Sequence, residues 1–84
     1  MVVDIEQRAK RSKSLLDNEW FMETMRDLRN DQMMVFANSS AQDVEKREDA
    51  HAMLRALNAI ERSLQSDVDA MTLIKRKEQH RGND

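Results

Sequence analysis

The sequence has no cysteine, no proline and a single glycine, at position 82. Without cysteine the chain cannot form a disulfide scaffold or a thiolate metal site. Without proline or interior glycine it has few of the residues that make the tight turns of sandwiches, barrels and β-hairpins. Aromatic residues are also scarce, at 4% of the 84 residues. These absences exclude most β architectures and favour an all-α fold.

Long apolar runs are absent as well. No segment approaches the roughly 20 apolar residues of a membrane span. Residues 1–13 lack the apolar segment of a signal peptide, so the sequence predicts an intracellular protein without membrane contact. The net charge of −2 is nearly balanced although 36% of the residues are charged. A net charge so close to zero gives the chain as a whole no electrostatic attraction to nucleic acid.

Helical periodicity predicts three helices, over residues 4–16, 17–37 and 43–79, in a single domain of residues 1–84. The polar segment at residues 38–43 is the only break in composition inside the chain. Serine, asparagine and aspartate in this segment favour a loop. We therefore expect one principal chain reversal there.

Aspartates are the predicted N-cap residues of all three helices: Asp4, Asp17 and Asp43, with Ser40 as the alternative to Asp43. If Asp17 caps the second helix, the residue before it and Phe21 occupy the two positions of a hydrophobic staple. That pairing would fix the angle at which the chain enters the second helix.

Each predicted helix has one inward stripe. The predicted inward positions are Ile5, Ala9, Ser12 and Leu16, then Phe21, Met25, Leu28, Gln32, Val35 and Phe36, then Ala50, Met53 or Leu54, Leu57, Ile60, Leu64, Val68, Met71 and Ile74. At 1.5 Å per residue the third helix is about 54 Å long, close to the combined length of the other two. We expect an elongated helical hairpin or three-helix arrangement, in which one long C-terminal helix packs on two shorter helices and ends in a basic tail.

A second face of the third helix has only small side chains, which we call the small-residue stripe. Its members are Ala52, Ala56, Ala59, Ser63, Ser66 and Ala70. They form a line roughly 120° around the helix from the apolar stripe. Small side chains let two helix backbones approach closely, so the stripe predicts self-association or binding of another protein. The alternative is that these are ordinary exposed residues in a helix that favours alanine.

The second helix has apolar residues away from its core face. Trp20 and Met34 point nearly opposite to the predicted core and are surrounded by acidic side chains. The acidic docking patch defined in this way is Trp20, Glu23, Asp27, Asp31 and Met34. Tryptophan is enriched at binding hot spots, and methionine adapts to varied partners. The alternative is that the first helix folds over Trp20.

Two basic clusters fall at the same end of the expected hairpin: Arg8, Lys10, Arg11 and Lys13 in the first helix, and Lys75, Arg76 and Lys77 in the third. Together they could contact phosphates. No aromatic face accompanies them for base stacking. Asp67 and Asp69 would lie opposite the first helix and neutralise part of the charge. Nucleic-acid binding is therefore a lesser possibility.

Catalytic patterns are missing from the sequence. His51 and His80 are far apart and lack a metal-ligand partner one helical turn away. Ser39 and Ser40 have no nearby base, so neither is a supported nucleophile. We expect His51 to join a surface ion pair with Glu48. We expect no enzyme activity, no cofactor and no metal.

Three short segments resemble a group of short helical proteins encoded by tailed bacteriophages. They are LLDNEWF at residues 15–21, DVEKRE at 43–48 and LRAL at 54–57. The resemblance covers about residues 5–77. It implies a viral origin and a structural or assembly role, with a location in the host cell cytoplasm or in the virion. It implies no catalytic residue.

The sequence as a whole predicts a non-enzymatic phage protein that acts by binding protein, as a small structural or assembly component of the virus particle. Its expected partners are further copies of itself, or another viral or host protein. One alternative is a small effector that inhibits a host enzyme or defence complex through the acidic docking patch. A further alternative is a packaging accessory that contacts nucleic acid through its basic end.

Overall fold

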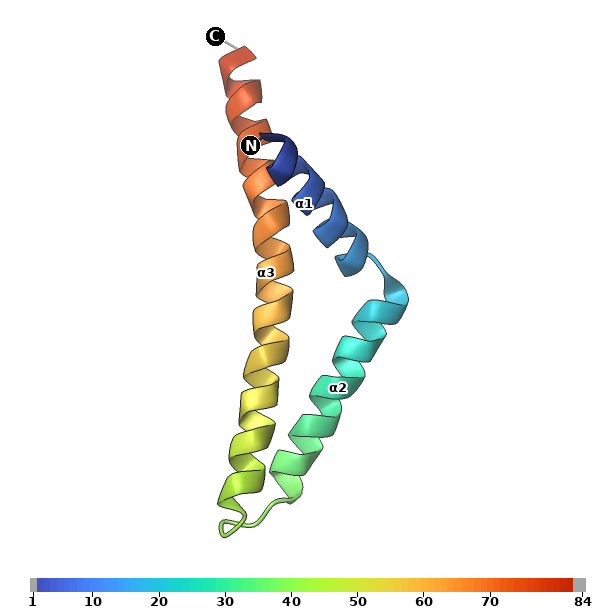
Figure 1. Ribbon diagram of the computed structural model, residues 1–84, viewed down its shortest axis with the longest axis vertical. Coiled ribbons are helices and arrows are strands. Elements are labelled where there is room, and N and C mark those ends of the chain that lie inside the picture. Colours follow the sequence, from blue (N-terminus) through green and yellow to red (C-terminus); the bar gives the residue numbers. More distant parts are fainter. Residues whose placement is uncertain (1, 83–84) are drawn as a thin grey trace.

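Three helices make up the fold in the computed structural model, which describes residues 2–82 (Figure 1). They are α1 (Val2–Leu16), α2 (Glu19–Asn38) and α3 (Val44–Gly82). The described part of the chain contains no strand. The expected all-α class, with one long C-terminal helix, is therefore confirmed.

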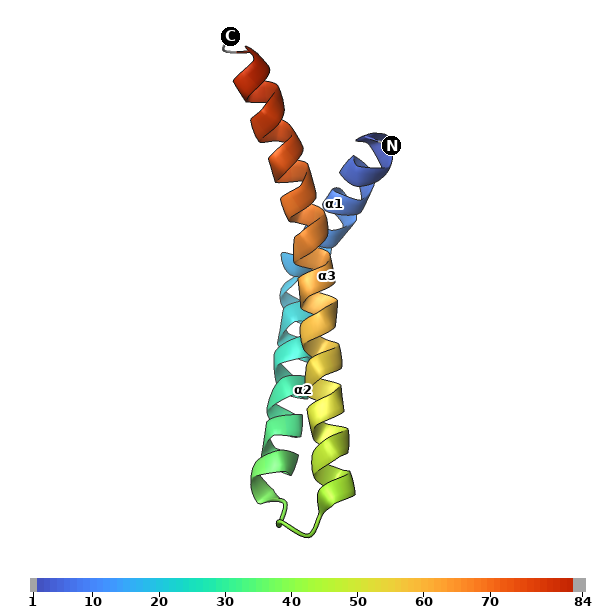
Figure 2. The ribbon, with the colours of Figure 1, turned by 90° about the vertical axis from the view of Figure 1, so that its left-hand side faces the viewer.

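The molecule is a rod with dimensions of 63 × 23 × 21 Å. α1 and α2 follow each other along α3, with α2 beside its first half and α1 beside its second half (Figures 1 and 2). Two contacts fix this register. Arg29 of α2 pairs with Glu61, and Ser12 of α1 bonds to Asp67. The first turns of α1 and the last turns of α3 diverge from each other (Figure 2).

The start of α2 differs from the prediction. Asn18 is the N-cap residue, since its side-chain Oδ1 accepts a hydrogen bond of 2.8 Å from the backbone N–H of Phe21. Asp17 instead lies directly after α1, where its backbone N–H bonds to the Lys13 carbonyl and its carboxylate pairs with the Lys13 ammonium. The predicted Asp17 cap is wrong. The staple positions therefore shift by one residue, so Leu16 and Phe21 no longer occupy them.

The other helix ends are close to prediction. α1 begins at Val2, so Asp4 lies in its first turn rather than at its N-cap. α3 begins directly after Asp43, as expected, and continues to Gly82, three residues beyond the predicted end. The Asp43 carboxylate accepts hydrogen bonds from the backbone N–H and the hydroxyl of Ser40, at 3.1 and 3.2 Å. These bonds close the reversal between α2 and α3.

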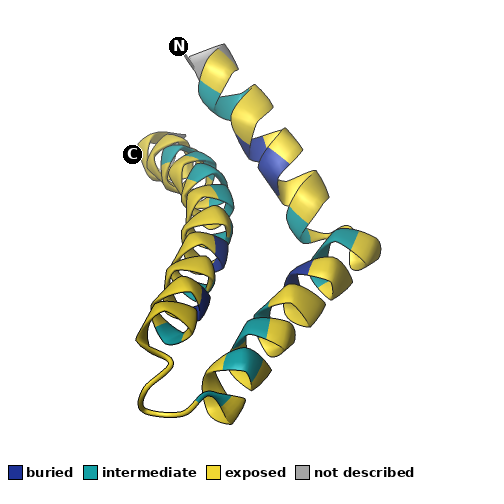
Figure 3. Cartoon of the chain, turned by 60° about the horizontal axis from the view of Figure 1, so that its bottom comes forward, coloured by how far each residue is buried: buried dark blue, intermediate teal, exposed yellow. Residues whose placement is uncertain are grey.

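The core is small. Among the residues that the structure describes, the buried apolar ones are Ala9, Met25, Ala50 and Leu57, and Ser12 is buried with them. Figure 3 shows the buried positions on the helix faces that are turned toward each other. All five belong to the stripes predicted from periodicity, so the inward faces of the three helices are confirmed.

Several predicted core residues are nevertheless half exposed. Leu28, Phe36, Met53 and Ile60 have exposed fractions of 40–46%. Their assignment to a closed core is wrong, because α3 has a helix on only one side at each level of the rod. A single neighbouring helix covers only a narrow strip of the helix surface. The edges of each apolar stripe therefore remain accessible to solvent.

The accessible surface of the chain is large for its mass. It measures 7005 Å², whereas a folded monomer of 9.9 kDa is expected to expose about 5,200 Å². The radius of gyration is 18.2 Å, against about 12 Å for a compact domain of this length. The excess of about 1,800 Å² on one chain is about twice the area that each partner buries in a standard protein–protein interface.

Candidate functional site

The small-residue stripe lies open on the surface of α3. All six of its members, Ala52, Ala56, Ala59, Ser63, Ser66 and Ala70, are exposed. Three of its alanines line a surface hollow together with two arginines and Asn58. The stripe is exposed because α1 and α2 both pack on the side of α3 that contains Leu57. The stripe is rotated by about 100° or more around the helix axis from that side.

Half-exposed apolar side chains border this stripe. Arg29 and Glu61 meet on one flank of the α2–α3 pair, with 3.0 Å between the Arg29 guanidinium and the Glu61 carboxylate. Sequence neighbours on a helix differ by about 100° in direction. Leu28 and Ile60 therefore lie on the opposite flank, and Met53, two turns before Ile60, lies there too. Their exposed fractions are 40%, 46% and 45%.

The two features form one continuous surface. Ala56 is three residues after Met53 and four residues before Ile60, so all three side chains are neighbours on α3. The flank defined by Leu28, Met53 and Ile60 thus continues into the small-residue stripe. An apolar surface with small side chains at its centre is suited to packing against another helix.

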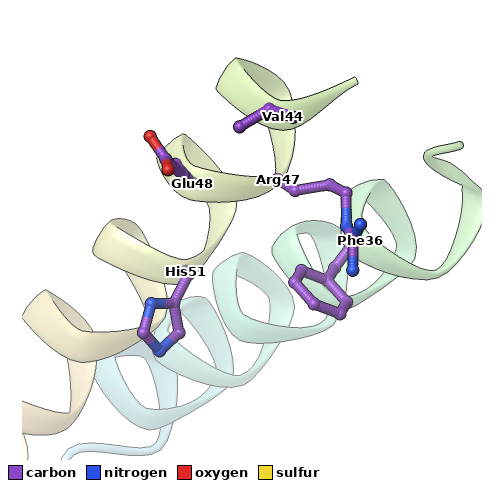
Figure 4. Close-up of a pocket in the computed structure, with 5 residues that line it drawn as sticks. All are labelled: Phe36, Val44, Arg47, Glu48 and His51. Carbon is purple, nitrogen blue, oxygen red and sulfur yellow. The ribbon is translucent and has the colours of Figure 1, made fainter. Parts of the chain in front are cut away.

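The other flank has a different chemistry. The Arg47 guanidinium lies over the Phe36 ring, 5.0 Å from its centroid. These two residues line an open hollow with Val44, Glu48 and His51. Figure 4 shows Arg47 extended over Phe36, while Glu48 points away from the ring. The expected ion pair between Glu48 and His51 is not among those formed by the described residues.

Sequence reasoning missed this hollow. The sequence does contain a signal for it. Phe36 lies just before the short loop and Arg47 shortly after it, so a reversal of the chain at the loop brings the two side chains opposite each other. A cation over an aromatic face gives a modest stabilisation. We assign it to closing the end of the hairpin.

The acidic docking patch is exposed throughout. Trp20 and Met34 have exposed fractions of 76% and 62%, and Glu23, Asp27 and Asp31 are also exposed. The alternative in which α1 covers Trp20 is therefore wrong. Asn18 begins α2 in a direction that leaves Trp20 on the outer face, almost opposite buried Met25.

Most of the basic cluster on α1 is paired with carboxylates. The separation is 3.3 Å between Arg8 and Asp67 and 3.4 Å between Lys10 and Glu6, and Lys13 pairs with Asp17. Arg11 is exposed. These pairs reduce the positive charge that α1 could offer to a phosphate.

The basic cluster on α3 has a different environment. Lys75, Arg76 and Lys77 are exposed, and no ion pair of the described residues includes them. They follow the point where α1 and α3 diverge (Figure 2). The two basic clusters occupy the same half of the rod, but most of the free charge belongs to α3.

Asp67 faces α1 as predicted and makes two contacts there. Its carboxylate accepts a 2.7 Å hydrogen bond from the Ser12 hydroxyl and pairs with Arg8. Asp69 does not share this role. It is exposed and accepts a hydrogen bond of 3.0 Å from Gln65 on its own helix, because two residues along a helix correspond to about 200° of rotation.

The described residues contain no group of three or more histidine, cysteine or acidic side chains that could hold a metal ion. No described helix combines the length and the apolarity that crossing a membrane requires. Comparison with known protein families, curated proteins and solved structures finds no match to this chain.

Proposed function

We propose that this chain is a non-enzymatic helical protein that acts by binding protein, and that its first partner is a second copy of itself. The observation that carries the proposal is the continuous surface of α3 formed by the small-residue stripe, Met53 and Ile60. All of it is accessible to solvent. The large total surface of the chain supports the proposal, because pairing of two copies would bury area that the monomer leaves exposed.

The close approach of two α3 helices is the essential feature of this interface. Alanine and serine at heptad spacing allow backbone contact, and the apolar flank adds burial at its edge. A charged, longer side chain at the centre of the stripe would hold the helices apart and bury an unpaired charge. Ala56 is suited to this test, because it belongs to the stripe and is a neighbour of Met53 and Ile60 on α3.

Sedimentation velocity at high micromolar concentration and high salt, where attraction between charged surfaces is screened, tests self-association through the stripe. We expect the wild-type chain to form a defined multimer and Ala56→Glu to dissociate it. Ala41→Glu, the same chemical change in the exposed turn outside the stripe, is the matched control and should leave the multimer intact. A wild-type chain that stays monomeric, or a multimer that Ala56→Glu does not affect, would contradict this proposal.

We further propose that the assembled protein is a structural or assembly component of a tailed-phage particle. This part rests on the resemblance of residues 15–21, 43–48 and 54–57 to short phage proteins. The direct test is to assay purified particles for the protein. Particles without it would exclude a structural role and leave an assembly role in the host cytoplasm.

A second candidate function is favoured by the exposure of Trp20. A small effector could use the acidic docking patch to bind and inhibit a host enzyme or defence complex. A pull-down from host extract would then recover a protein that Trp20→Ala loses. Recovery of the same proteins by both chains would remove this candidate. A nucleic-acid role has less support, since three of the four basic residues in the α1 cluster are paired with carboxylates.

A further inference from the structure

The C-terminal end of α3 has a surface that faces no other helix among residues 2–82 (Figure 2). α3 continues without a break to Gly82, and its last turns leave α1 behind (Figure 2). Half-buried Ile74 lines a surface hollow together with Lys77, Glu78 and Arg81. This hollow thus combines an apolar side chain with two exposed cations and one exposed carboxylate, for a net positive charge. It suits a ligand that offers an apolar side chain next to carboxylates.

The acidic docking patch offers that combination. Trp20 and Met34 are its apolar members, and Glu23, Asp27 and Asp31 occupy the same outer face of α2. None of these three carboxylates takes part in an ion pair formed by the described residues. Their charge is therefore available to a partner.

The charges of the two surfaces are complementary. Residues 19–34 contain four acidic and two basic side chains, for a net charge of −2. Residues 75–81 contain four basic side chains and one acidic side chain, for a net charge of +3 with neutral histidine. Opposite charge on two unpartnered surfaces of the same chain favours their association.

The two surfaces of a single chain cannot meet. The end of α3 continues the helix beyond α1 and lies in the half of the rod away from α2 (Figure 1). The patch lies on the side of α2 opposite buried Met25, which faces the core. The complementary surface must therefore come from another copy.

We propose that the C-terminal end of α3 of one copy binds the acidic docking patch of a second copy. Trp20 fills the hollow beside Ile74, where its ring is buried and is close to the cations. Lys77 and Arg81 lie against the carboxylates of Glu23 and Asp27. The contact joins two different surfaces, so each copy keeps one free surface and the pair keeps one of each kind. Such a head-to-tail contact produces a ring or an open filament rather than a closed dimer.

This association goes beyond the proposed function and uses neither the small-residue stripe nor the apolar flank. The two can be separated by making every measurement in the Ala56→Glu background, in which contact through the stripe is removed. If that chain still associates, the head-to-tail contact is responsible. Ala56→Glu alone thus reports on the stripe contact, and further substitutions in that background report on the head-to-tail contact.

The experiment uses two charge-reversal variants in that background. Lys77→Glu/Arg81→Glu removes the basic surface and keeps the acidic docking patch. Glu23→Lys/Asp27→Lys removes the patch and keeps the basic surface. Arg11→Glu/Lys46→Glu is the matched control, since it reverses two exposed cations outside both surfaces. Circular dichroism of each variant checks that its helices are retained.

Association is measured by sedimentation velocity at low and high salt, with fluorescence of Trp20, the single tryptophan of the chain, as a second signal. The parent chain should grow in mass with concentration at low salt and lose this association at high salt. For each charge-reversal variant alone, the association constant should fall about tenfold or more. The variant should therefore be monomeric at concentrations at which the parent associates. An equimolar mixture of the two should associate again, because each patch then meets an oppositely charged end of α3 on the other variant, and the tryptophan emission should shift to the blue. The control should behave as the parent.

Several results would overturn the proposal. One is a parent chain that is monomeric at high micromolar concentration and low salt. Another is a variant that still associates like the parent, or a control that loses association as the variants do. A mixture of the two folded variants that remains monomeric would also overturn it. So would the finding that Trp20 is covered only by an unrelated protein.

Discussion

The hydroxyl of buried Ser12 donates a hydrogen bond of 2.7 Å to the carboxylate of Asp67, which joins α1 to α3 across 55 positions of sequence. Arg8 pairs with the same carboxylate at 3.3 Å. The inward stripe of α1 has little apolar area, since its two buried members are an alanine and this serine. Asp67 is consequently the main polar attachment of α1 to the rest of the rod.

We predict that Asp67→Ala loosens α1. The substitution leaves the Ser12 hydroxyl buried without its partner and frees Arg8, at a cost of about 1–3 kcal/mol. Urea unfolding followed by circular dichroism measures the change in the free energy of unfolding. Asp69→Ala is the control, and because Asp69 is exposed its effect should stay within about 0.5 kcal/mol. Equal effects of the two substitutions would show that the Asp67 contact is unimportant.

A second prediction separates the core from its edge. Leu57 is 3% exposed, whereas Ile60 is 46% exposed. Leu57→Ala should cost about 2–5 kcal/mol through lost burial and the cavity left behind. Ile60→Ala should cost less than half as much in the monomer, because much of its side chain is already in water. Thermal unfolding at low protein concentration compares the two, and a reversed order would contradict the burial described above.

The start of α2 provides a third prediction. Asn18→Ala removes the hydrogen bond between the Asn18 side chain and the backbone N–H of Phe21. Loss of an N-cap side chain costs about 1 kcal/mol. Asp17→Ala removes only an exposed ion pair with Lys13 and should cost less than about 0.5 kcal/mol. A larger loss of unfolding free energy in Asp17→Ala than in Asn18→Ala would instead show that Asp17 is the N-cap residue of α2.

A fourth prediction concerns pH. Hydrogen bonds from the backbone and the hydroxyl of Ser40 lower the pKa of Asp43 below its ordinary value of 3.8. A folded-state pKa below the unfolded value contributes stability that is complete above the unfolded pKa and is lost as the pH falls through the folded one. Asp43 should therefore stabilise the turn at neutral pH and lose this effect below about pH 3.8.

Nuclear magnetic resonance titration of the Asp43 side-chain carboxyl measures that pKa directly. Ser40→Ala should move it upward, because the hydroxyl hydrogen bond is lost. Ser14→Ala, at an exposed position of α1, should leave it unchanged. A midpoint for Asp43 at or above 3.8 in the wild-type chain would be inconsistent with the Ser40 contacts.

Much of this fold follows from helical periodicity. The spacing of Ala9, Ser12, Met25, Ala50 and Leu57 is sufficient to identify the inward face of each helix, and composition locates the one reversal. Two kinds of detail do not follow. Asp17 and Asn18 are both good cap residues, so the choice depends on how α1 ends and not on residue type. Helical spacing likewise places Ile60, and not Glu61, on the inward stripe of α3. In the structure Glu61 contacts Arg29 of α2, and Ile60 lies at the edge of the core.

The candidate surfaces were predictable to a different extent. A helical wheel places the small-residue stripe and Trp20 away from the core, and the structure leaves them exposed. The pairing of Arg8 with Asp67 and the position of Arg47 over Phe36 depend on the register of helices far apart in sequence. Periodicity within one helix has no information on that register.

The reversal at residues 39–43 also affects the order in which the chain assembles. Arg29 and Glu61 meet across 32 positions, whereas Ser12 and Asp67 are 55 positions apart. Closing a longer loop costs more entropy, and contacts at larger separation form later. We expect the α2–α3 hairpin to form first and α1 to join it last. Amide hydrogens of α1 should consequently exchange with solvent fastest, because undocking one short helix opens them without unfolding the hairpin.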